Sequence, residues 1–249
     1  ANNIPYYEVD DINAIESIEL LTHLSPDYLF VSWPKLLKEA VISIAGYGCI
    51  GTHPTLLPAN RGRHPLHWSI TQGLKNSALS FFILEAGVDS GRLLHQLNFE
   101  ISPTDDINAL NEKVDKLACQ GIRNIDELVL KPFHQALLTG TGKTLIDFTE
   151  KQATDAVNYW RQKTPFDVMI DLRLPALDII RIVLSFSTPY PCAILLFEDD
   201  ILRVSHAEVI KYQSLGTNIR IENLEPGKIL SASSQFVCVK SGDCIIRLH

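Results

Sequence analysis

The 249-residue sequence has little that would tie it to a membrane, a metal or a disulfide scaffold. No run of about 18 apolar residues occurs, so no membrane-spanning helix is expected. The five cysteines are odd in number and form no Cys-x-x-Cys pair, which argues against a disulfide framework and a zinc site. The start, ANNIPYYEVDD, lacks the basic and apolar regions of a signal peptide. These absences predict a soluble, cytoplasmic protein that holds no metal.

Positive charge is also scarce. The formal net charge is −7 and the sequence pI is about 5.6, so no overall field attracts the protein to nucleic acid or to an acidic membrane face. Over residues 151–249, eleven lysines and arginines are balanced by eleven acids, which leaves a net charge of zero. With 46% hydrophobic residues, the chain can bury the core of one large domain or of two ordinary ones.

Apolar runs of strand length alternate with helical spacings in the first part of the chain. The runs predict strands at 4–9, 28–33, 48–53 and 79–84, and the spacings predict helices at 12–24, 35–43 and 65–74. A longer helical pattern covers 104–137. This alternation is typical of a Rossmann-like parallel α/β sheet, in which functional residues follow the carboxyl ends of the strands. His53 stands at such an end.

The character of the sequence changes after residue 137. Residues 138–150 are polar and glycine-rich, and we interpret them as a linker between a catalytic domain over 1–137 and a second domain over 151–249. The second domain begins with two helical patterns, at 152–162 and 174–187. Short strands with turn residues between them follow, which favours a small β-barrel or sandwich.

Two motifs carry no function in their context. GTGKT at 140–144 lacks the first glycine of a phosphate-binding P-loop, because Leu137 stands at that position, and it follows a helix instead of a strand. The acidic cluster EDD at 198–200 lies between two strand-like runs, where a solvated turn is the better interpretation than a metal site.

One loop does indicate chemistry. His53 is followed by Pro54 and Pro58, whose locked φ angles hold the loop stiffly. A second turn, EAGVDSG at 85–91, places the Asp89 carboxylate between glycines. A carboxylate beside an imidazole orients the ring and favours its charged form, as general acid and base catalysis requires. We therefore expect His53 and Asp89 to form a catalytic pair that assists attack of an amine on a carbonyl.

The same stretches carry a family resemblance. HPTLLPANRGRHPLHWSI, followed by LEAGVDSGRLL, resembles the formyltransferases that use N10-formyltetrahydrofolate, whose signature is Asn-x-His-x-Ser-Leu-Leu-Pro, then Arg-Gly, and later Asp-x-Gly. The sequence after residue 163 is similar to the OB-like C-terminal domain of methionyl-tRNA formyltransferases and of some sugar N-formyltransferases. The resemblance implies a Rossmann-like catalytic domain followed by a small OB-like β-barrel.

Roles for single residues follow from the resemblance. It implies that His53 takes a proton from the acceptor amine and that Asp89 keeps this histidine suitably protonated. Arg61 and Arg63 would lie toward the acceptor. The binding site of the formyl donor, N10-formyltetrahydrofolate, would be lined by Ser32, Trp33, Glu85, Ala86, Gly87 and Val88. A homodimer is a further expectation at the level of the family.

Two departures from the family pattern stand out. Gly51 occupies the position of the family asparagine, so no side chain remains there to stabilise the oxyanion. Loss of one such donor typically lowers the rate by about 10²–10³. In addition, family members have a strand and a helix before the stretch IPYYEV, and this chain begins at Ala1 without a methionine. We therefore expect the N-terminal part of the catalytic domain to be missing from this chain.

The acceptor is expected to be an amino sugar carried on a nucleotide. Recognition of tRNA depends on phosphate contacts, and the neutral balance of 151–249 does not supply a basic surface. The Arg-Gly-Arg-x-Pro form of the loop also resembles the sugar enzymes more than the tRNA enzymes. Two alternatives remain open: a methionyl-tRNA formyltransferase, and a non-catalytic relative that binds folate or a sugar nucleotide.

Overall fold

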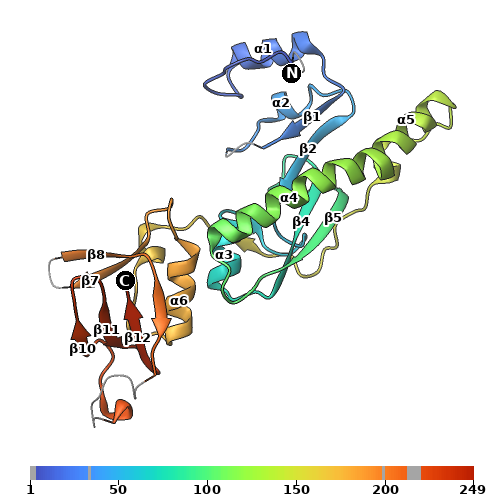
Figure 1. Ribbon diagram of the computed structural model, residues 1–249. Coiled ribbons are helices and arrows are strands. Elements are labelled where there is room, and N and C mark those ends of the chain that lie inside the picture. Colours follow the sequence, from blue (N-terminus) through green and yellow to red (C-terminus); the bar gives the residue numbers. More distant parts are fainter. Residues whose placement is uncertain (1–3, 33–34, 198–199, 212–219) are drawn as a thin grey trace. The chain divides into compact units, whose positions relative to one another are not determined.

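The computed structural model describes residues 4–32, 35–197, 200–211 and 220–249, and the chain forms two compact units (Figure 1). Neither unit is continuous in sequence, because the chain passes between them several times. Unit 1 contains Ala1–Gly62, Ala78–Asn98 and Leu117–Tyr159. Unit 2 contains Arg63–Ser77, Phe99–Lys116 and Trp160–His249. The predicted division of the chain at 138–150 remains a prediction.

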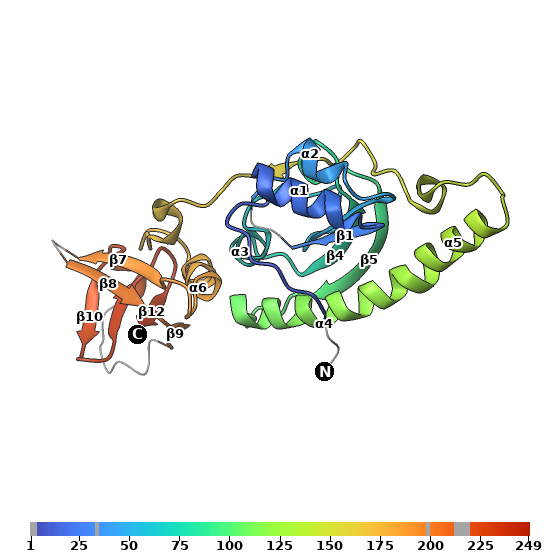
Figure 2. The same cartoon turned by 90° about the horizontal axis from the view of Figure 1, so that it is seen from above.

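Unit 1 is built on a four-stranded sheet with the order β1-β2-β4-β5. The strands are β1 (Tyr28–Val31), β2 (Gly48–His53), β4 (Asn76–Ile83) and β5 (Leu93–Glu100). The helices α1 (Ile15–Leu24) and α2 (Glu39–Ile42) lie on one side of this sheet and α4 (Ile107–Ile125) lies on the other (Figure 2). The predicted α/β architecture is thereby confirmed.

The direction of one strand differs from the expectation. β1 and β2 are parallel, but β4 runs antiparallel to β2 and pairs Ser80 with His53 and Phe82 with Gly51. A continuous apolar run such as that of β4 predicts burial on both faces of a sheet, and it contains no information about strand direction. The sheet is therefore mixed where the sequence predicted a parallel one.

The long helical pattern is confirmed. α4 continues through a π-helical turn, η1 (Asp126–Leu130), into α5 (Lys131–Leu138). At Gly121 a Cβ atom would come within 2.2 Å of the Phe81 ring, so glycine is what allows α4 to approach β4 this closely. This contact fixes the helix against the middle of the sheet.

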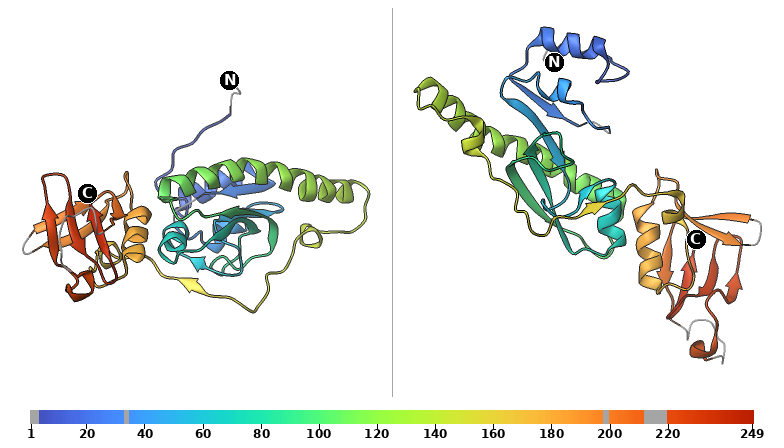
Figure 3. Two further views of the ribbon diagram at one scale, coloured as in Figure 1. Left: turned by 60° about the horizontal axis from the view of Figure 1, so that its bottom comes forward. Right: turned by 180° about the vertical axis from the view of Figure 1, so that it is seen from behind.

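The first predicted strand, at 4–9, is wrong. Residues 4–9 have no regular structure, and they extend away from the sheet (Figure 3). Ile4 and Tyr6 are each 78% exposed. Alternating apolar residues form a strand only when a neighbouring strand accepts their hydrogen bonds, and no described strand does so here.

The segment between α5 and the C-terminal strands is the second departure. The helix predicted at 152–162 is wrong, because these residues contain only the short strand β6 (Tyr159–Trp160), which pairs with β3 (Arg61–Gly62). The segment before it includes a 3₁₀ turn, η2 (Leu145–Phe148), and a bridge from Glu150 to Leu93. Pairing with strand edges, rather than helical spacing, decides the conformation of this segment.

Unit 2 combines helices with antiparallel strands around its own core. Its helices are α3 (Pro65–Thr71) and α6 (Ala176–Ser185), with the 3₁₀ turns η3 (Pro165–Val168) and η5 (Ile221–Asn223). One sheet has the order β10-β11-β12-β9, and a second consists of β7 and β8. The strands are β7 (Ala193–Phe197), β8 (Asp200–Val204), β9 (Ala207–Val209), β10 (Ile229–Ala232), β11 (Val237–Lys240) and β12 (Ile245–Leu248).

The core of unit 2 lies between α6 and these sheets (Figure 3). Ile179 of α6, Ala193 of β7 and Ile246 of β12 are each fully buried in it. The predicted small β domain is therefore confirmed. Of the acidic cluster at 198–200, Glu198 and Asp199 lie outside the described residues, and Asp200 begins β8.

Candidate active site

The strand β2 ends at His53. A tight turn follows, in which the N–H of Thr55 donates to the backbone oxygen of His53 at 2.9 Å. The hydroxyl of Ser80, opposite His53 in β4, donates to the backbone oxygen of Thr55 at 2.5 Å. Gln96 donates to the same hydroxyl at 2.8 Å and to the backbone oxygen of Leu57 at 3.1 Å. These buried contacts fix the loop that follows the strand, so the histidine is held by the sheet and by the loop together.

The partners of His53 identify its basic nitrogen. The Nε2 atom lies 2.9 Å from the backbone oxygen of Asn60, and a carbonyl oxygen can only accept a hydrogen bond. The neutral imidazole therefore carries its proton on Nε2 and its lone pair on Nδ1. This Nδ1 atom lies 3.6 Å from Oδ2 of Asp89, and the ring is only 5% exposed. A proton taken up at Nδ1 thus lies between the ring and the carboxylate.

Asp89 belongs to the turn between β4 and β5. Its backbone is left-handed, with φ 49°, a conformation that is uncommon outside glycine and that aspartate adopts more readily than most residues. Its Oδ2 atom accepts the N–H of Gly62 at 2.8 Å. At Gly91, a Cβ atom would lie 1.6 Å from the backbone oxygen of Ile83, so the turn can close onto β4 only with glycine at this position. Sequence reasoning proposed His53 and Asp89 as a pair, and the structure brings them together.

Arg61 is placed differently from the sequence expectation. Its side chain is 7% exposed and points inward, where Nη2 donates to Gln152 at 2.6 Å and Nη1 donates to Tyr159 at 3.0 Å. These contacts occupy two of the guanidinium nitrogens within the protein. Arg63 is exposed and belongs to unit 2. A contact of either arginine with an acceptor stays a prediction.

The residues expected around the formyl donor are mostly accessible. Glu85, Ala86, Gly87 and Val88 form an exposed turn after β4. Ser32 is exposed and directly follows Val31, which pairs with Gly51. Trp33 lies outside the described residues. An accessible backbone turn beside the His53 strand fits a planar ring with hydrogen-bonding edges, but the donor-binding role of these residues remains a prediction.

A side chain at position 51 would meet the side chain of Leu84, which would have to shift to make room. A Cβ atom at Gly51 would lie 2.6 Å from Cδ2 and 3.1 Å from Cγ of Leu84. Leu84 packs against the cluster of Leu57, Phe82 and Leu93. Its side chain therefore fills the volume that a side chain at position 51 would need.

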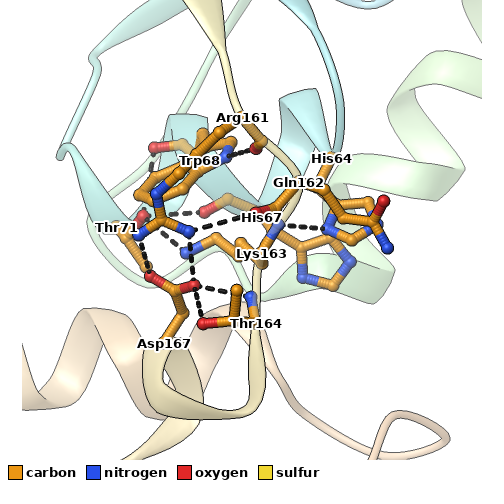
Figure 4. A network of polar contacts seen from close by, with 9 residues as sticks. All are labelled: His64, His67, Trp68, Thr71, Arg161, Gln162, Lys163, Thr164 and Asp167. Atoms are coloured by element: carbon orange, nitrogen blue, oxygen red, sulfur yellow. Dashed lines mark hydrogen bonds and ion pairs between the residues drawn. The ribbon is translucent and has the colours of Figure 1, made fainter.

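The other histidines of the same stretch lie in unit 2, in a second network (Figure 4). His67 donates from Nδ1 to the backbone oxygen of Ser185 at 2.5 Å, and burial lowers its pKa to about 4. Lys163 lies 3.8 Å from the centre of the Trp68 ring and donates to Thr71, and burial lowers its pKa to about 8. Because none of the carboxylates in the described ranges faces His67 as Asp89 faces His53, we interpret this network as structural.

Sequence reasoning missed Gln152, which is 6% exposed and contacts both Arg61 and the Asp89 turn. The interpretation of its surroundings as a helix concealed it. Among the described residues, no three His, Cys, Asp or Glu side chains are grouped to hold a metal ion. Within the same described ranges, no helix has the length and apolar character needed to cross a membrane.

Known proteins resemble both the first and the last part of this chain. Residues 7–125 match the family described as "Formyl transferase", and residues 162–249 match "Formyl transferase, C-terminal domain". The methionyl-tRNA formyltransferase of Acidithiobacillus ferrooxidans is 30% identical over 253 residues, a match that covers 100% of this chain and 72% of that protein.

Solved structures show the same fold at lower identity. HypX from Aquifex aeolicus matches 94% of this chain with a TM-score of 0.67 and 15% identity, and the chain spans 38% of that longer protein. A second match is an N-formyltransferase from Helicobacter canadensis in complex with folinic acid and dTDP-3-aminofucose. The match covers 88% of this chain and 71% of that protein's chain, with a TM-score of 0.59 and 13% identity. At these identities the likeness concerns the fold alone.

Proposed function

The chain belongs to the formyltransferase family, and we propose that it transfers a formyl group from N10-formyltetrahydrofolate to the amine of a nucleotide-linked amino sugar. The observation that supports transfer is the pair of His53 and Asp89, whose facing atoms are 3.6 Å apart. His53 offers the lone pair of Nδ1 to a proton of the attacking amine, and Asp89 faces the resulting imidazolium. General base catalysis of this kind contributes about 10²–10⁴ to the rate.

The expected donor suits the exposed turn at 85–88. Its backbone groups offer donors and acceptors to a pterin ring, and its accessibility leaves room for a ligand of that size. N10-formyltetrahydrofolate supplies the formyl group when bound. The chain's own contribution is to hold this donor beside His53 and to accept the amine proton.

The charges of residues 151–249 favour a small acceptor over tRNA. Among the described residues of this range, five cations are seen in ion pairs with carboxylates. These pairs are Arg161–Asp167, Arg173–Asp171, Arg181–Asp178, Lys228–Glu225 and Arg247–Glu208. Lys163 and Lys240 are buried, 8% and 4% exposed. Binding of tRNA relies on cations that replace counterions, and in this segment the cations are balanced by an equal number of acids, so no net positive charge remains.

A second acceptor has its own support. The relatives at 30% identity include methionyl-tRNA formyltransferases from Acidithiobacillus ferrooxidans and Clostridium perfringens. Methionyl-tRNA is therefore the alternative acceptor. Both acceptors present a primary amine next to a phosphate-bearing group, so the chemistry at His53 is the same for either.

The test is a transfer assay with matched acceptors. The protein is mixed with N10-formyltetrahydrofolate and, in separate reactions, with dTDP- and UDP-linked amino sugars or with methionyl-tRNA. Tetrahydrofolate release is followed together with the mass gain of one formyl group on the acceptor. We expect turnover with at least one sugar, and a kcat about 10³ lower in His53→Ala. Turnover with methionyl-tRNA alone would overturn the amino-sugar acceptor. Donor binding without any turnover would overturn the enzyme and support the non-catalytic relative.

A further inference from the structure

Gln152 joins the buried arginine of β3 to the turn that carries Asp89. Its side-chain oxygen accepts from Nη2 of Arg61 at 2.6 Å. Its side-chain nitrogen donates to the backbone oxygens of Asp89 at 2.8 Å and of Gly91 at 2.7 Å. With 6% exposure, Gln152 has all three contacts inside the protein.

These contacts permit only one orientation of the Gln152 amide. If oxygen and nitrogen exchanged places, the NH₂ group would face the guanidinium, which only donates, and the oxygen would face two carbonyls, which only accept. In the observed orientation, one acceptor and two donors meet partners of the opposite kind. Both N–H groups of Gln152 and one lone pair of its oxygen are therefore used, which suits a side-chain amide at this position.

Arg61 strengthens this arrangement. Its guanidinium is 7% exposed, its recorded partners Gln152 and Tyr159 are neutral, and its Nε atom has no hydrogen-bond partner among the described residues. A charge that donates to an amide oxygen polarises the amide, and the amide N–H groups become better donors. The charge of Arg61 therefore strengthens the hydrogen bonds that Gln152 donates to the carbonyls of Asp89 and Gly91.

We propose that Gln152 is a positioning residue that holds the Asp89 turn in its left-handed conformation and so keeps the carboxylate within reach of Nδ1 of His53. This proposal rests on the proposed function. Gln152 lies 63 residues from Asp89 in sequence, and it ties the segment after α5 to the catalytic pair. A shift of about 1 Å in a catalytic group can lower a rate by about 10².

The test compares a variant that loses the contacts of Gln152 with the Asp89 turn and a variant that loses other contacts of the same segment. Gln152→Glu keeps an acceptor for Arg61 but places carboxylate oxygens against the backbone oxygens of Asp89 and Gly91, so the turn has to move. Arg92→Gln is the matched control, because Arg92 donates to Thr149 at 2.7 Å from Nε and at 2.8 Å from Nη2, and so ties the same segment to β5.

In the transfer assay we expect Gln152→Glu to lower kcat by about 10² while KM for both substrates changes little. Arg92→Gln is expected to keep the wild-type kcat. In an Asp89→Asn background, Gln152→Glu should add almost nothing, because residues acting through one another are not additive. A wild-type kcat in Gln152→Glu, or an equal loss in both backgrounds, would overturn the proposal. Should Gln152→Glu not fold, Gln152→Met carries the same expectations.

A measurement without turnover separates the two proposals. The imidazole nitrogens of His53 are observed by NMR in protein labelled at histidine with ¹⁵N and assigned with His53→Ala. We expect the His53 signals of Gln152→Glu to move toward those of Asp89→Asn, while Arg92→Gln keeps the wild-type signals. If the wild-type protein turns over no acceptor, the proposed function fails, and this measurement still decides the role of Gln152. Unchanged His53 signals in Gln152→Glu would refute it.

Discussion

Two histidines of the stretch 53–70, His53 and His67, lie in opposite environments. His53 is buried beside a carboxylate and a backbone oxygen, with its Nδ1 atom 3.6 Å from Asp89. His67 is packed against aromatic rings, 5.0 Å from that of Phe186 and 4.8 Å from that of Tyr190, and burial lowers its pKa to about 4. The two residues are of the same type and lie close together in sequence. The difference in their chemistry therefore comes from the groups that contact each ring. A buried histidine becomes a candidate base when an acidic group faces its free nitrogen.

The largest effect is expected when each of the two histidines is replaced separately and the two variants are compared in the transfer assay. His53→Ala removes the base and should lower kcat by about 10³. His67→Gln should leave kcat close to wild type, because its ring contacts Ser185, His64 and the aromatic rings of Phe186 and Tyr190, all in unit 2. Steady-state transfer kinetics of both variants check this. Equal losses in both would end the distinction drawn between the two sites.

A smaller loss is expected when only the carboxylate beside His53 is neutralised. Asp89→Asn keeps an oxygen that can accept the N–H of Gly62, so the turn is retained while the charge is lost. We expect kcat to fall by about 10². Asp171→Asn, an exposed carboxylate paired with Arg173, is the control and should have wild-type kinetics. An Asp89→Asn variant as fast as the wild type would show that the charge beside Nδ1 is dispensable.

The local structure around His53 and Asp89 was predicted well from the sequence. The strand that ends at His53 and the glycine-bracketed turn of Asp89 are local patterns, and each is found where it was expected. Gln152 was not predictable, because its role depends on partners 61 to 91 residues away. The direction of β4 was missed for a similar reason: its apolar run is equally compatible with either direction, and only its pairing with β2 decides.

A third prediction concerns Gly51, next to the same histidine. Gly51→Asn should lower the free energy of unfolding by about 1–3 kcal/mol, because the new side chain meets Leu84 at 2.6 Å. In a Leu84→Ala background the same substitution should cost much less, since the space is then free. Urea unfolding of the wild type and of the three variants measures this coupling. If Gly51→Asn costs the same in both backgrounds, Leu84 does not restrict the position.

The activity of these variants extends the test. An asparagine at position 51 restores a donor beside His53, and such donors contribute about 10²–10³ to transfer rates. Gly51→Asn with Leu84→Ala is therefore expected to transfer formyl faster than Leu84→Ala alone. Equal rates would mean that the oxyanion is stabilised from elsewhere in the site.

The smallest effect is expected at His67, in its response to acid. The folded-state pKa of His67 is about 4 and its ordinary value is 6.5, so the unfolded chain binds a proton more readily between these values. Its contribution to stability is complete above about pH 6.5 and is lost as the pH falls toward 4. His67→Gln cannot be protonated and still offers a donor to Ser185. Its melting temperature should therefore fall less than that of the wild type between pH 7 and pH 4.5, by a few degrees. The exposed His23, changed to glutamine, should leave the acid response as in the wild type. If His67→Gln loses as much as the wild type, burial of the His67 ring does not limit stability in acid, and the contrast with His53 would rest on Asp89 alone.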